Sequence, residues 1–93
     1  MVPTVFDGVA SLEIELLVVG DSLPCDRARA LWRQLCEEHR ITLVVHDMSR
    51  GEGAEISRRL RLKAVPAVLI NGELMAVGVQ SRDEASALLE SVS

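Results

Sequence analysis

The chain has 93 residues, enough for one domain with a single hydrophobic core. Hydrophobic residues make up 48% of the chain and charged residues 26%, a balance typical of a folded domain and not of a disordered one. The net charge of −4 and the aromatic content of 2% argue against nucleic-acid binding, which uses basic surfaces and aromatic side chains that stack on bases.

The sequence also argues against a membrane or secreted location. No apolar run approaches the ~20 residues that a membrane-spanning helix needs. The start of the chain is apolar overall, but Asp7, Glu13 and Glu15 do not fit a signal peptide, and no basic segment precedes them. We therefore expect a cytoplasmic protein without a membrane partner. In that compartment Cys25 and Cys36 are expected to stay reduced.

Residues 1–11 show no clear period and contain Pro3 and Gly8, so we expect a poorly ordered leader or a short extra strand there. The folded domain is expected to span residues 12–93. Its first strand is predicted at residues 12–19, because a nearly continuous apolar run favours a central strand that is buried on both faces.

A helix is predicted to follow this strand. Ser22 and Asp21 are both good N-cap residues, and Pro24 suits the first turn. Apolar residues at helical spacing predict the buried face: Ala28, Leu31, Trp32, Leu35 and Cys36. A second strand at residues 41–46 then completes a β-α-β unit with parallel strands and a right-handed crossover.

Residues 49–53 contain two glycines and are predicted to form a loop. A short helix is expected at residues 54–62, with Ile56 and Leu60 facing inward. Basic residues cluster around the end of this helix: Arg58, Arg59, Arg61 and Lys63. We interpret them as a solvated helix face; the alternative is a site for an anion such as a carboxylate of glutathione.

The last third of the chain predicts a hairpin and a helix. Pro66 is expected just before a strand at residues 67–70, because proline cannot donate to a sheet ladder. Asn71-Gly72 predicts a tight turn into a strand at residues 73–77. Residues 81–84 form a capping-box pattern. The helix that follows has this apolar stripe: Ala85, Leu88, Leu89 and Val92.

This order of elements, β-α-β-α-β-β-α, resembles the thioredoxin core. The resemblance covers residues 12–92, and its most specific marks are Val65-Pro66, the Asn71-Gly72 turn and Val77-Gly78. The leader is too short to supply the extra strand and helix that open a full thioredoxin. The resemblance therefore implies a minimal, glutaredoxin-sized, thioredoxin-like α/β fold, with a four-stranded mixed sheet flanked by helices.

In such proteins a cysteine motif at a helix start faces a cis-proline, here Pro66. The family's Cys-x-x-Cys motif is replaced by Ser22-x-x-Cys25. We favour the register in which Cys25 matches the second cysteine. Ser22 then stands at the nucleophile position, and Pro24 lies where thioredoxins often have proline. In the alternative register Cys25 is the first cysteine of a motif similar to that of monothiol glutaredoxins, Cys25-Asp26-Arg27-Ala28.

Thiol–disulfide exchange needs a thiolate that attacks and a second thiol that resolves the mixed disulfide. The hydroxyl of Ser22 does neither and reads more simply as a helix cap. The buried carboxylate that thioredoxins use for proton transfer falls at Leu16. Cys36 cannot be the missing partner, because eleven helical residues separate it from Cys25 by about 16 Å. Two-cysteine thioredoxin chemistry is therefore not expected.

Two functions remain open. The chain is either a weakly active, oxidoreductase-like protein that forms a mixed disulfide through Cys25, with a protein disulfide or with glutathione as its partner. Or it is a redox-inactive module that binds a protein partner, or a second copy of itself, in the family's groove. That groove is expected to be lined by these residues: Pro24, Val65, Pro66 and Gly78.

No cofactor is expected, apart from glutathione as a co-substrate of the first function. Residues 77–80 depart from the Gly-Gly-x-Asp-like segment of glutaredoxins, which counts against glutathione. No metal is expected either. Cys36 and His39 are an i, i+3 pair and His46 follows, but two ligands on one helix fall short of the three or four that zinc requires. We expect a monomer or a weak homodimer.

Overall fold

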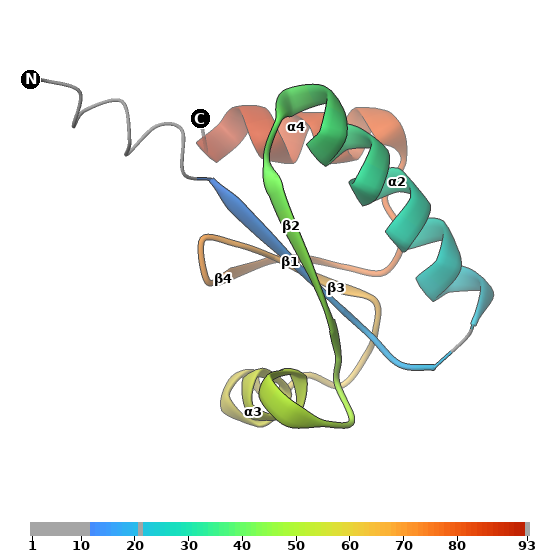
Figure 1. Cartoon of the computed structure of the whole chain (residues 1–93), viewed down its shortest axis with the longest axis vertical. Coiled ribbons are helices and arrows are strands. Elements are labelled where there is room, and N and C mark those ends of the chain that lie inside the picture. The colour runs from blue at the N-terminus through green and yellow to red at the C-terminus, as the bar shows by residue number, and fades with distance from the viewer. Residues whose placement is uncertain (1–11, 21, 93) are drawn as a thin grey trace, which may run out of the picture.

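The structure is a computed structural model and describes residues 12–20 and 22–92. The elements of this part of the chain follow in the predicted β-α-β-α-β-β-α order (Figure 1): β1 (Glu13–Val18), α2 (Leu23–His39), β2 (Thr42–Asp47), α3 (Gly51–Leu60), β3 (Ala67–Ile70), β4 (Glu73–Val77) and α4 (Arg82–Val92). The expected leader, residues 1–11, lies outside the described residues. No helix in the described ranges is long and apolar enough to cross a membrane.

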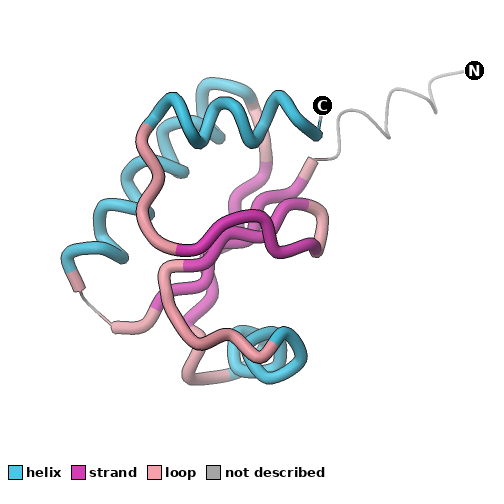
Figure 2. The backbone as a smooth tube through the Cα atoms, turned by 180° about the vertical axis from the view of Figure 1, so that it is seen from behind, coloured by secondary structure: helices cyan, strands magenta, loops and turns pink. Residues whose placement is uncertain are grey.

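The strands form one four-stranded sheet in the order β2-β1-β3-β4. β1 is parallel to β2 and antiparallel to β3, and β3 and β4 form an antiparallel hairpin. β1 is therefore a central strand, as its continuous apolar run predicts. Helices α2 and α4 cover one face of the sheet and α3 covers the other, so the molecule has three layers (Figures 1 and 2).

The core is divided by the sheet, because successive side chains of a strand point to opposite faces. Leu16 joins the larger cluster, which includes Trp32 and Leu35 of α2. Leu17 joins the smaller cluster, which includes Ile56 of α3. Trp32 has no exposed surface, so the first helix is anchored firmly on the sheet. This anchoring fixes the position of the motif at its N-terminus.

Two local signals that were read from the sequence form the expected contacts. Asn71 and Gly72 both have positive φ values, 51° and 85°, as a two-residue type I′ hairpin turn requires. The capping box of α4 is reciprocal. Ser81 N donates to Glu84 Oε1 at 2.8 Å, and Glu84 N donates to Ser81 Oγ at 3.1 Å. Both predictions are confirmed.

The predicted bounds of the middle helix are wrong. The loop at residues 49–53 and the helix at residues 54–62 are replaced by α3, which begins at Gly51 and ends at Leu60. Gly53 is buried inside this helix, and a Cβ atom on it would lie 2.1 Å from the carbonyl oxygen of Asp47. A glycine that signals a loop in the sequence here allows a helix to pack closely on the end of β2.

Candidate functional site

The motif begins with a capped helix. Ser22 is the N-cap of α2, and its Oγ accepts a hydrogen bond from Cys25 N at 3.3 Å. The carbonyl oxygen of Ser22 accepts from Asp26 N at 2.9 Å. Pro24 lies in the first turn. The Ser22 hydroxyl thus caps the helix N-terminus, where it satisfies a backbone N–H that would otherwise lack a partner.

Cys25 lies inside the core. Its residue is 1% exposed, and it belongs to the same buried cluster as Leu16, which is not exposed at all. The motif cysteine is therefore surrounded by apolar side chains, Leu16 among them. A reactive thiolate must also be accessible, because a sulfur atom of the substrate disulfide has to contact it directly. Cys25 is therefore not the exposed, readily modified thiol that the oxidoreductase-like function requires.

Three segments form what we call the motif surface: residues 22–24, Val65-Pro66 and residues 78–79. The Val65-Pro66 peptide bond is cis. Gly78 N donates to Pro66 O at 2.7 Å, which joins the second segment to the third. Val65 packs against the core cluster to which Cys25 also belongs. Pro66 itself is fully buried, whereas Pro24 is exposed and Val65 and Gly78 are partly buried, so the predicted groove stays a prediction.

The motif surface exposes apolar side chains. Leu23 is 62% exposed and Val79 is 44% exposed. Val19 and Val77, which lie next to the motif surface in the sequence, are 41% and 49% exposed. Single exposed apolar residues are ordinary, and these four are notable because they lie in or near the three segments. Sequence reasoning placed Pro24 and Gly78 here and overlooked these larger side chains.

Gln80 links the motif surface to the core. Trp32 Nε1 donates to Gln80 Oε1 at 3.4 Å, and Gln80 Nε2 donates to Gly78 O at 3.1 Å and to Val77 O at 3.4 Å. An indole N–H can only donate, so the amide oxygen must face Trp32 and the amide nitrogen must face the two carbonyls. Hydrogen bonds therefore run from Trp32 through Gln80 to Gly78, and from there to Pro66.

Replacing Gln80 with glutamate should loosen this connection. The carboxylate still accepts from Trp32 but cannot donate to the Gly78 carbonyl. One net hydrogen bond is worth about 1 kcal/mol, so we expect the Gly78 amide to exchange with solvent about fivefold faster. Hydrogen exchange followed by NMR measures this rate. Gln34→Glu is the matched control, because Gln34 is exposed on α2. An unchanged Gly78 rate would show that Gln80 does not hold this loop.

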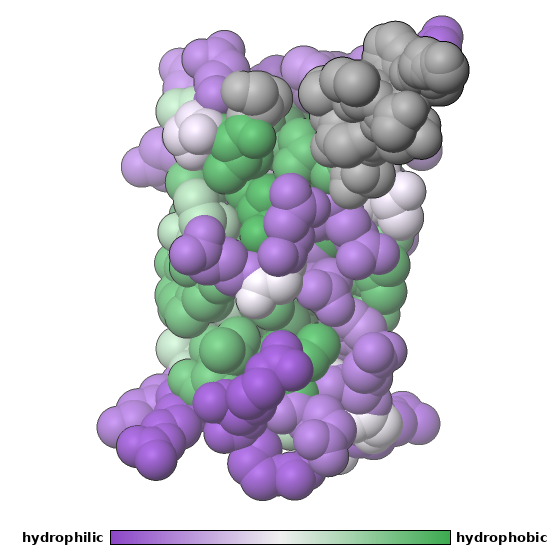
Figure 3. Space-filling model, turned by 90° about the vertical axis from the view of Figure 1, so that its left-hand side faces the viewer, coloured by the Kyte–Doolittle hydropathy of each residue, from purple (hydrophilic) through white to green (hydrophobic). Residues whose placement is uncertain are grey.

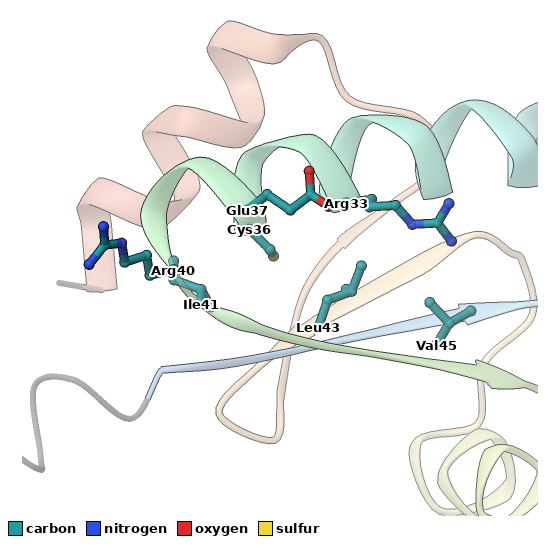
Figure 4. A pocket seen from close by; sticks show the side chains of 7 residues that line it. All are labelled: Arg33, Cys36, Glu37, Arg40, Ile41, Leu43 and Val45. Atoms are coloured by element: carbon teal, nitrogen blue, oxygen red, sulfur yellow. The ribbon is translucent and has the colours of Figure 1, made fainter.

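A separate cleft with a volume of about 410 Å³ lies between α2 and β2 (Figure 4). Its lining is Arg33, Cys36, Glu37, Arg40, Ile41, Leu43 and Val45. Cys36 is 3% exposed and belongs to the core, as predicted. Burial raises the pKa of Cys36 to about 11, so its thiol is protonated at neutral pH and is a poor nucleophile.

The raised pKa of Cys36 predicts a loss of stability in alkali. In the unfolded chain this thiol ionises near its ordinary pKa of 9.0, whereas in the folded chain it stays protonated to about pH 11. Its contribution is therefore full below pH 9 and falls as pH rises to 11, by about 3 kcal/mol at most. Urea unfolding should show the stability difference between wild type and Cys36→Ala shrinking over this range. A constant difference would contradict the prediction.

Outside the motif surface, a histidine pairs with a glutamate across two neighbouring strands. His46 Nε2 lies 3.0 Å from Glu15 Oε2 across β1 and β2. Residues 12–20 and 22–92 contain no group of three or more His, Cys, Asp or Glu side chains that could hold a metal ion. The basic residues in the last turn of α3 and just after it are exposed, and Arg58 pairs with Glu55 at 3.2 Å, which agrees with a solvated helix face.

Comparisons with known proteins agree with this fold. A family model described as a thioredoxin domain matches residues 13–90. No curated protein matches the chain. The crystal structure of chloroplastic thioredoxin z is similar, with a TM-score of 0.72 over 91% of this chain and 80% of that one, at 17% sequence identity. At this identity the likeness concerns the fold alone. Because the family model spans nearly the whole described domain, the chain belongs to the thioredoxin domain family.

Proposed function

We propose that this thioredoxin-fold domain is a binding module that holds an extended, apolar segment of a protein partner on the motif surface, without thiol exchange. The observation that carries the proposal is the burial of Cys25, which is 1% exposed beneath a surface whose apolar side chains are open to solvent. In this proposal the motif stays at the start of α2, and binding of a partner segment takes the place of thiol exchange.

The residues of the motif support the absence of exchange. A thiolate that attacks a disulfide forms a mixed disulfide, and a second thiolate must then attack the enzyme's sulfur so that the partner's sulfur leaves as a thiolate with the electron pair. Ser22 carries no sulfur, and its Oγ caps the helix. Cys36 lies in a different cleft, where burial raises its pKa to about 11. No second thiol is therefore placed to resolve a disulfide of Cys25.

The surface itself supports binding. Its loops are held before any partner arrives, by the Gly78–Pro66 hydrogen bond and by Gln80. A surface that is already ordered loses little conformational entropy when it binds. The exposed Leu23 and Val79 would contribute most, because burying apolar area is the main favourable term in association. We therefore infer a partner segment that presents apolar side chains.

A random peptide library displayed on phage tests this proposal. We expect wild type to select peptides rich in apolar residues. Leu23→Asp and Val79→Asp should each weaken those peptides by about tenfold or more, which corresponds to about 1.4 kcal/mol. Leu74→Asp is the matched control, because Leu74 is 38% exposed on β4 and lies outside the motif surface. Peptides that bind both motif-surface variants as tightly as wild type would contradict the proposal.

A further inference from the structure

The two edges of the sheet differ. Within the described residues β2 pairs with β1 alone and β4 with β3 alone, so each strand leaves one side open. The β3–β4 ladder has a register shift at Val68/Leu69, whereas β2 runs in unbroken register through all six of its residues. Polarity does not distinguish the two edges, because Figure 3 shows apolar surface also on the side where the β3–β4 hairpin lies. A bulge disfavours the addition of another strand, and a regular edge allows it.

The open edge of β2 is apolar on the side of the cleft. Leu43 and Val45 of β2 point toward α2, and Ile41, which directly precedes the strand, also lines the cleft (Figure 4). Val45 is 39% exposed, although it is a large apolar side chain in the middle of the strand. A strand added at this edge would place its own side chains over the cleft. The shape and polarity of this edge therefore fit an apolar strand.

The charges above the cleft indicate which strand fits. Arg33 and Glu37 of α2 are exposed, and neither forms an ion pair with a described residue. They stand one helical turn apart, about 6 Å along the helix axis. A two-fold axis that passes between them would bring Arg33 of each copy beside Glu37 of the other. The rim of the cleft is thus complementary to itself, as the interface of a symmetric dimer must be.

We propose that the β2 edge and the adjoining cleft are the interface of a homodimer, in which two β2 strands pair antiparallel about a two-fold axis near Leu43. In Figure 4 Leu43 lies below the part of α2 between Glu37 and Arg33, so one axis serves both the strands and the charges. Pairing centred on Leu43 sets Leu43 opposite its own copy and Ile41 opposite Val45. Ile41, Leu43 and Val45 of the two copies then meet and close both clefts.

This interface is independent of the proposed partner binding, because it uses the C-terminal half of α2 and not its first turn. Sedimentation equilibrium of the full chain is the test, and we expect a concentration-dependent dimer. Arg33→Glu and Glu37→Arg should each raise the dissociation constant about tenfold or more, since each creates two like-charge pairs. The combined exchange Arg33→Glu/Glu37→Arg should restore the dimer.

Arg59→Glu is the matched control, since Arg59 is exposed on α3 and reverses the same charge away from the cleft. A chain that stays monomeric at protein concentrations up to about 1 mM would overturn the proposal. So would a dimer that ignores both single reversals, or one that the combined exchange does not restore. Peptide binding by the motif surface would be unaffected by either result.

Discussion

Ser22→Cys is expected to close a reversible disulfide with Cys25 under mild oxidation. Cys25 N donates to Ser22 Oγ at 3.3 Å across the first turn of α2, and two residues at this spacing at a helix start are expected to have Cβ atoms within the roughly 3.5–4.5 Å that a disulfide needs. A loop of four residues gives about 2 kcal/mol of stabilisation in the chain-entropy model. Thiol titration should fall from three free thiols to one on oxidation, because Cys36 stays buried.

The same variant should gain measurable insulin reduction in the presence of dithiothreitol, whereas wild type should show none. Leu16, which is fully buried, should keep the rate below that of an ordinary thioredoxin. Ser22→Ala is the control, because it removes the cap, worth about 1 kcal/mol, without adding sulfur. If the cysteine variant kept three free thiols after oxidation, Cys25 would be the first cysteine of a monothiol motif.

Gly53→Ala should destabilise the fold. Alanine normally improves a helix by up to about 1 kcal/mol over glycine. Here the new Cβ atom would lie 2.1 Å from the carbonyl oxygen of Asp47 and 3.0 Å from the Cβ atom of His46. The nearest of these atoms belongs to the backbone of β2, so α3 must shift away from the sheet. We expect a loss of about 1 to 3 kcal/mol in the free energy of unfolding.

Urea unfolding measures this loss, with Glu52→Ala as the control at the neighbouring, exposed position of α3. The control should lie within about 0.5 kcal/mol of wild type. If Gly53→Ala were as stable as Glu52→Ala, the close approach of α3 to β2 would be wrong.

Local signals explain why most of the fold could be predicted from the sequence. The Asn71-Gly72 turn and the capping box of Ser81 and Glu84 act over two to four residues, so the residues that decide them stand side by side in the chain. The apolar periodicity of α2 likewise predicts a buried Trp32. The bounds of α3 were predicted wrongly for the opposite reason. The role of Gly53 depends on Asp47 in a neighbouring strand, which lies outside any local pattern.

The candidate site was harder to predict, because contacts distant in the sequence define it. Val65-Pro66 and Cys25 were found through the resemblance of their motif to a family. Gln80 was not found, since its link to Trp32 spans 48 residues and a lone glutamine carries no pattern. The burial of Cys25 was also left open, because a residue near a helix start faces solvent or core according to how the helix sits on the sheet.

The most direct test of the proposed function is the reactivity of Cys25 in the folded chain. Cys36→Ala leaves Cys25 as the only thiol, and mass spectrometry after incubation with glutathione disulfide then follows the formation of a mixed disulfide at this one sulfur. We predict that native Cys25 stays unmodified and becomes glutathionylated only when urea exposes it. Rapid glutathionylation of the folded chain, with release of one glutathione thiol per protein, would contradict the binding-module account and favour the monothiol oxidoreductase.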